Sequence, residues 1–132
     1  MSSVSHNERG SISGFVVVLS MTFVACAGLA FDGGRMIAAR AEATDAAENA
    51  ARAGAQQVTS LRSGNPSIDK SSAIISANRF LERIGVNGAA TADENSVTVT
   101  TNIKVPMVLL GIFGVQYKSV SVVRSAQPFT DP

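Results

Sequence analysis

The residues that could do chemistry are few and lie far apart. The one histidine, His6, stands in a polar stretch beside Glu8, and the one cysteine, Cys26, stands in an apolar run. A single histidine and a single cysteine cannot build a Cys/His zinc site, an intrachain disulfide or a CxxC redox pair. We therefore expect no metal site and no cofactor.

The other polar motifs do not match those of catalysts. Asp93 and Glu94 are adjacent carboxylates in an expected loop, where solvation explains them better than acid–base catalysis or Ca²⁺ binding. Serines are abundant, but none lies in a GxSxG or SxxK motif, and the GIFG at 111–114 lacks the lysine of a phosphate loop. The sequence predicts a protein that is not an enzyme and has no small-molecule substrate.

Length and composition limit the remaining classes. The chain has 132 residues, of which 45% are hydrophobic and 5% aromatic, and a formal net charge of +1. This length suits one domain, or an anchor with a small domain. Because no basic block is present, we expect no nucleic-acid partner.

The strongest pattern is a run without charged residues over 10–31, between Arg9 and Asp32. About 20 such residues cross a bilayer core as a helix. We predict a polar tail over 1–9 that stays in the cytoplasm, a single transmembrane helix over 10–31, and an extracytoplasmic remainder.

Two alternatives remain open for this segment. Ala25-Cys26-Ala27 has the small-x-small form of a signal-peptide cleavage site. Cys26 could instead be the lipid-bearing residue of a lipoprotein. Either alternative would leave a small secreted or lipid-anchored binding domain that uses the apolar segment 106–115.

An alanine-rich stalk is expected over 32–60. It contains no proline and could continue the span as one helix of about 48 residues, interrupted only by Gly33 and Gly34, which could act as a hinge. Small residues recur along it at helical spacing, which suits close packing of helices. They pack either against other subunits or against the chain's own domain. These packing candidates are Ala39, Ala43, Ala47, Ala50, Ala51, Gly54 and Ala55.

Residues 61–132 are expected to form a small exported head, which makes the fold class α+β. After a linker over 61–69, Ser67 or Asp69 caps a second helix that ends at Gly85, and 86–95 is loop-like with a turn at Asn87-Gly88. The alternating segment 96–106 and the segment 116–126 predict an antiparallel β-hairpin over the second helix.

Between these strands lies an apolar segment, 106–115, which is too short to span a membrane. It either plugs the core of the head or forms a patch that meets the membrane or another subunit. The side chains of the patch are Met107, Leu109, Leu110, Ile112 and Phe113.

Four segments in order carry a family resemblance: RGS at 9–11, GLAFDGGR at 28–35, AARAE at 38–42 and DAAENAARAGA at 45–55. Together with the apolar span, they resemble the N-terminal module of TadE/TadG-like proteins of the tight-adherence (Flp) pilus system, particularly the actinobacterial type. The β-rich end of the chain is similar to their exported domain more loosely.

The resemblance implies a membrane-anchored minor pilin or pseudopilin, structural and without catalysis, that helps to assemble a surface pilus. Its implied partners are the lipid bilayer and other pilin or Tad-system membrane subunits, including copies of this chain. Prepilin-type processing would fall between Gly10 and Ser11. Such substrates commonly carry a glutamate five positions after the processed glycine, where this chain has Phe15. A membrane-anchored assembly factor is therefore the second interpretation within the family.

Overall fold

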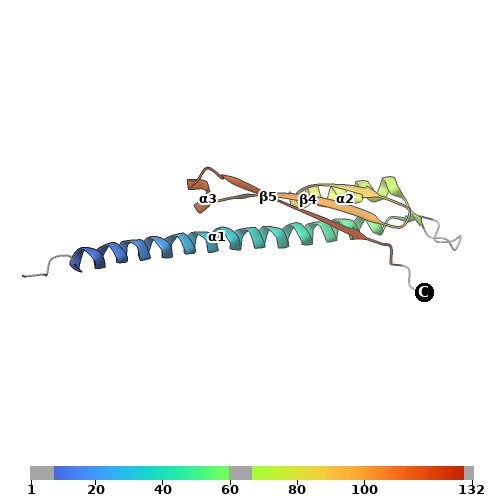
Figure 1. Cartoon of the computed structure of the whole chain (residues 1–132). Coiled ribbons are helices and arrows are strands. Elements are labelled where there is room, and N and C mark those ends of the chain that lie inside the picture. Colours follow the sequence, from blue (N-terminus) through green and yellow to red (C-terminus); the bar gives the residue numbers. More distant parts are fainter. Residues whose placement is uncertain (1–7, 60–66, 130–132) are drawn as a thin grey trace, which may run out of the picture.

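A computed structural model describes residues 8–59 and 67–129. One long helix, α1, extends well beyond a small head that lies along its C-terminal half (Figure 1). The elements follow the order α1 (Glu8–Ala55), β1 (Val58–Thr59), β2 (Ser67–Ile68), α2 (Lys70–Ile84), β3 (Asn87–Ala92), β4 (Val97–Pro106), α3 (Leu109–Ile112) and β5 (Tyr117–Ala126).

The predicted span and stalk form one helix of 48 residues. A segment with this much alanine and no proline has high helix propensity throughout. The helix is unbroken at Gly33 and Gly34, and a hinge at this pair stays a prediction. The chain leaves α1 after Ala55, and the short strands β1 and β2 then pair in antiparallel fashion.

The second helix begins and ends where its capping residues predict. The Asp69 carboxylate accepts hydrogen bonds from the Ser72 amide at 3.2 Å and from the Ser72 hydroxyl at 3.0 Å. Gly85 ends the helix in the left-handed conformation, with φ of 72°, which glycine adopts without steric cost. Most of the linker predicted over 61–69 lies outside the described residues.

The predicted hairpin is confirmed, and the sheet contains one more strand than expected. β4 and β5 pair antiparallel from Val97 opposite Ala126 to Pro106 opposite Tyr117. The loop predicted over 86–95 is wrong, because 87–92 form β3, which pairs with the other edge of β4. The turn expected at Asn87-Gly88 is instead the start of this strand. A Cβ on Gly88 would lie 2.5 Å from the Thr100 carbonyl oxygen, so a glycine is needed for this close pairing.

The position predicted for the hairpin also needs correction. The hairpin was expected over the second helix, but β4 and β5 lie mainly against α1, and α2 packs against α1 and β3 rather than under the hairpin. The reason is the small size of the α1 side chains, which lets the sheet approach the helix closely. The segment named a stalk from the sequence is therefore one wall of the head's own core.

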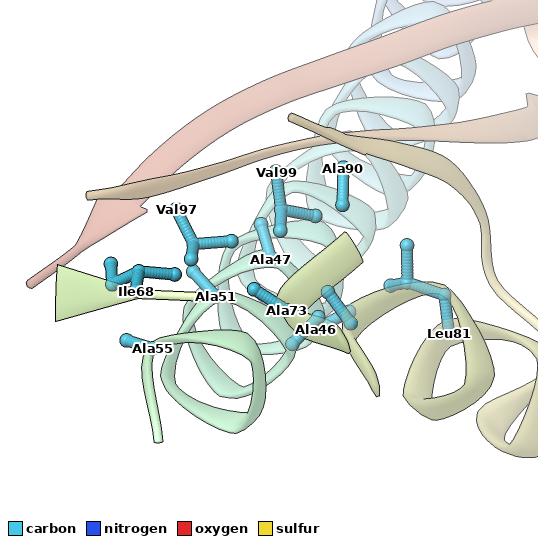
Figure 2. Close-up of a cluster of buried hydrophobic side chains, with 12 residues drawn as sticks. Ala46, Ala47, Ala51, Ala55, Ile68, Ala73, Leu81, Ala90, Val97 and Val99 are labelled. Atoms are coloured by element: carbon cyan, nitrogen blue, oxygen red, sulfur yellow. The ribbon is translucent and has the colours of Figure 1, made fainter. Parts of the chain in front are cut away.

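Figure 2 shows Val97 and Val99 of β4 directed toward Ala51 and Ala47 of α1. All four side chains are fully buried. Leu81 of α2 fills the side of the same cluster. A second cluster continues along α1 toward the N-terminus of this helix, where Val105 and other side chains of the hairpin cover α1. The core therefore extends along the helix rather than forming a globule of its own.

One polar side chain lies on the apolar face of β4. Thr101 is fully buried, and its hydroxyl donates a hydrogen bond to the Ala43 carbonyl oxygen of α1 at 2.8 Å. Buried hydroxyl groups need such partners, because an unpaired one costs about 1–3 kcal/mol. The bond links one position of the strand to one turn of the helix. Thr101 thereby sets how far the hairpin reaches along α1.

Two glycines of α1 allow a matched test of this packing. A Cβ on Gly54 would lie 2.9 Å from both the Ala73 carbonyl oxygen and Val97 Cγ1, whereas a Cβ on Gly33 would meet nothing within 4 Å. Gly54→Ala should lower the free energy of unfolding by about 1–2 kcal/mol, because overpacking outweighs the gain in helix propensity. Gly33→Ala should raise it by about 0.5–1 kcal/mol.

Thermal unfolding of the full chain in detergent micelles, followed by circular dichroism, would measure both changes. Each 1 kcal/mol corresponds to a shift of about 4–8 °C in Tm for a domain of this size. Equal shifts for the two variants would contradict close packing at Gly54.

Candidate functional site

The best-defined site lies where α1 meets the tip of the β4–β5 hairpin, residues 108–117. α1 is the one helix among the described residues that is long and apolar enough to cross a membrane. Asp32 is the first charged residue after its uncharged run, and yet only 2% of Asp32 is exposed. The hairpin tip covers this carboxylate on the side of α1 that faces the head.

The Asp32 carboxylate accepts three backbone hydrogen bonds from the hairpin tip. Oδ1 accepts from the Val108 amide at 2.8 Å, and Oδ2 accepts from the amides of Leu109 and Leu110 at 2.9 and 3.1 Å. These amides belong to the first turn of α3, where the amides of a helix have no partner within the helix. The N-cap residue Val108 makes no side-chain capping bond of its own. A side chain from a distant part of the sequence therefore caps α3.

The same bonds explain the charge state of Asp32. The hydrogen bond from Val108 is the main cause that holds the pKa of this carboxyl below its ordinary value. Burial opposes this effect, and the other two amides and the positive charge of Arg35 add to it. Asp32 is therefore a carboxylate at neutral pH, and its charge is compensated by backbone dipoles.

A close contact one turn nearer the N-terminus completes the site. A Cβ on Gly28 would lie 3.0 Å from both Cβ and Cδ2 of Leu109. The absence of a side chain at Gly28 gives Leu109 room against the α1 backbone. Gly28 and Asp32 are four residues apart, so they lie on the same face of the helix, and both contact the tip.

The residues of the predicted apolar patch divide into two groups. Met107 is buried in the core against α1, and Leu109 and Leu110 are half-buried where the tip meets α1. Ile112 and Phe113 are each 78% exposed. One part of the segment therefore plugs the core, and the other part faces outward.

The predicted packing residues of α1 are all buried by the chain's own head. These are Ala39, Ala43, Ala47, Ala50, Ala51, Gly54 and Ala55. Of the two partners considered for them, the structure shows the chain's own domain, so they are not a free surface for another subunit. The predicted processing residues Gly10 and Ser11 are exposed in the first turns of α1.

The residues considered for catalysis do not converge. Cys26 is exposed on α1, Asp93 and Glu94 are exposed between β3 and β4, and Glu94 lies 3.8 Å from Lys70. His6 lies outside the described residues. Within the ranges 8–59 and 67–129, no three His, Cys, Asp or Glu side chains are placed to hold a metal ion.

Sequence reasoning missed the roles of Asp32 and Thr101. For Asp32, the sequence offered one signal. It is a single carboxylate directly after the apolar span, without the acidic neighbours that are typical of a solvated helix face. For Thr101, the signal was a hydroxyl in register with the buried valines of β4. Neither signal indicates which residue is the hydrogen-bond partner, because the partners lie 58 or more positions away in the sequence.

The cap on α3 can be tested one amide at a time. Asp32→Ala should remove the hydrogen-exchange protection of the Val108, Leu109 and Leu110 amides, because these amides lose their acceptors. Asp45→Ala changes an exposed carboxylate of the same helix and should leave the three amides protected. Hydrogen exchange measured by NMR in micelles would check this, and unchanged protection in Asp32→Ala would contradict the cap.

Acid should weaken the same contact. The pKa values of Asp32 and Asp69 are both held below their ordinary value of 3.8, by amide hydrogen bonds from Val108 and Ser72 respectively. Their contribution to stability is therefore complete above pH 3.8 and is lost as the pH falls through the lower native values. Tm should drop between pH 5 and pH 2, and it should drop less in Asp32→Asn than in the wild type or Asp45→Asn. Equal acid loss in all three proteins would contradict this assignment.

Comparison with known proteins covers the α1 side of this site and not the hairpin side. Residues 10–57 match the family model described as "Putative Flp pilus-assembly TadE/G-like". The match begins within the first turn of α1 and ends two residues after the helix, and it includes Gly28 and Asp32. No significant match was found among curated proteins or among solved structures. Over α1 and the two residues that follow it, the chain is thus similar to TadE/TadG-like proteins of the Flp pilus-assembly family.

Proposed function

We propose that the protein is a membrane-anchored structural component of a Flp/Tad-type pilus system, acting as a minor pilin or pseudopilin or as an accessory assembly component. The match of residues 10–57 to the pilus-assembly family carries this proposal. The family supports a role in Flp pilus assembly, and the architecture supports the finer role.

The architecture suits a subunit that is held in a membrane and presents a head outside it. From Gly10 to Phe31, α1 carries no charge, and its large apolar side chains are exposed. From Asp32 to Ala55, the same helix is a wall of the head. Anchor and head share one helix, and no linker separates them. In the proposed topology, residues 1–9 stay in the cytoplasm and the head lies on the extracytoplasmic side.

The described residues also favour a structural role over a catalytic one. A hollow of about 740 Å³ lies between the end of α1 and the end of β5, and it is lined by Arg52, Gln56, Phe129 and neighbouring residues. The lining residues do not include a His, Cys, Asp or Glu. The hydroxyl of Ser125 lies in this lining, but no His, Asp or Glu of the lining is present to act as its base, so the hollow does not hold a serine with an activating base.

The core of the head is the same in this proposal and in a secreted domain. Cleavage after Ala27 would leave every core residue of α1 in the product, because the buried side chains of this helix begin at Asp32. A released head would therefore keep its core. The mature N-terminus, rather than the folding of the head, separates the two functions.

The test is the mature mass and N-terminal sequence of the protein from its native cell, after separation of membrane, sheared-surface and medium fractions. An intact chain, or one that begins at Ser11, in the membrane or sheared fraction with co-purifying pilus subunits is the expected result. A chain that begins at Gly28 in the medium would overturn the proposal. A lipid-modified Cys26 at the N-terminus would also overturn it.

Deletion of the gene tests the role in pilus assembly. The deletion strain should lose or misassemble Flp pili, and the wild-type gene should restore them. Normal pili in the deletion strain would contradict a role in assembly.

A further inference from the structure

We infer that the hairpin tip inserts into the lipid–water interface of the bilayer that α1 crosses, as a second membrane contact of the chain. The tip is defined as residues 108–117, which contain α3 and the first residue of β5. The inference rests on the proposed membrane anchoring and not on a role in pilus assembly.

The depth of the tip follows from its contacts on α1. A helix from Gly10 to Phe31 is about 33 Å long, close to the thickness of about 30 Å of a hydrocarbon core. Leu109 packs on Gly28, about 4–5 Å before the end of this span, and the α3 amides bind Asp32, directly after it. The contacts thus place α3 at the boundary between lipid and water.

The tip carries the side chains that such a boundary favours. Ile112 and Phe113 are each 78% exposed, and Tyr117 is 65% exposed. Val108 and Val115 add exposed apolar surface beside them. An exposed apolar cluster of this kind is unfavourable in water. Tyrosine is enriched at membrane interfaces because its ring is apolar and its hydroxyl is polar.

The apolar surface of the tip lies at the same level as exposed side chains of the span. Leu29 and Phe31 are 55% and 58% exposed on α1, within one turn of the Gly28 contact. Figure 1 shows α3 at the end of the head that points back toward the N-terminal half of α1. Lipid that surrounds Leu29 and Phe31 therefore also reaches the tip, which favours lipid over a second protein as the occupant.

The charges near the tip agree with a lipid surface. Lys118 is the one charged residue in the segment 106–119, and Arg35 lies over the Phe31 ring at 5.8 Å. Lysine and arginine next to apolar side chains can extend toward lipid phosphates. The carboxylate at this level, Asp32, is covered and paired with amides, so it does not face the lipid headgroups.

Because the chain has no tryptophan, single-tryptophan variants report each position separately. The full chain would be reconstituted in phosphatidylcholine/phosphatidylglycerol vesicles, with or without lipids brominated near the headgroup or deep in the chains. Phe113→Trp tests the tip. Phe23→Trp in the span is the positive control, and Ile75→Trp, exposed on α2, is the matched control in the head.

Phe113→Trp should show blue-shifted emission and lose intensity with shallow brominated lipids, and Phe23→Trp should lose intensity with deep ones. Ile75→Trp should respond to neither and should be quenched by aqueous iodide. If Phe23→Trp responds and Phe113→Trp behaves like Ile75→Trp, the inference is overturned while anchoring stands. If Phe23→Trp does not respond either, anchoring itself fails.

A contact between two copies of the chain gives a different result. Emission of Phe113→Trp would then shift to the blue as the protein-to-lipid ratio rises, without quenching by brominated lipids. That outcome would also overturn insertion of the tip.

Discussion

The head depends on the alanine face of α1. Alanines at spacings of three and four leave the helix surface almost flat, so the valines of β4 and the small residues of α2 reach the backbone of α1 closely. Both α2 and the sheet pack against this helix. The head is therefore not a domain attached to a stalk. Its core includes the part of α1 from Ala39 to Ala55.

Two polar contacts then fix where the hairpin lies along this smooth surface. Alanine faces specify position weakly, because one turn of the helix resembles the next. The Thr101 hydroxyl selects the turn at Ala43, and the Asp32 carboxylate selects the first turn of α3. From Thr101 to Leu109 an extended chain reaches up to about 26 Å, and α1 extends about 16 Å from Ala43 to Asp32. The two contacts are therefore compatible with one register.

The sequence predicts local features well and long-range contacts poorly. Alanine content predicts α1, Asp69 and Gly85 predict the ends of α2, and alternation predicts β4, because each signal lies within a few residues. β3 was mistaken for a loop, since Gly88 indicates a turn unless the strand beside it is known. The site at Asp32 could not be predicted, because its partners are backbone amides, which every residue carries. The family resemblance, by contrast, could be read from the sequence, because the segments that carry it best lie within α1, between Arg9 and Ala55.

The unbroken helix also couples the apolar segment to the head. If α1 stays straight at Gly33 and Gly34, a shift of the apolar segment along the helix axis by one turn, about 5.4 Å, moves the head by the same distance. A rotation of the anchor about its axis must likewise turn the sheet. Movement of the apolar segment is then passed to the head through the backbone of a single helix.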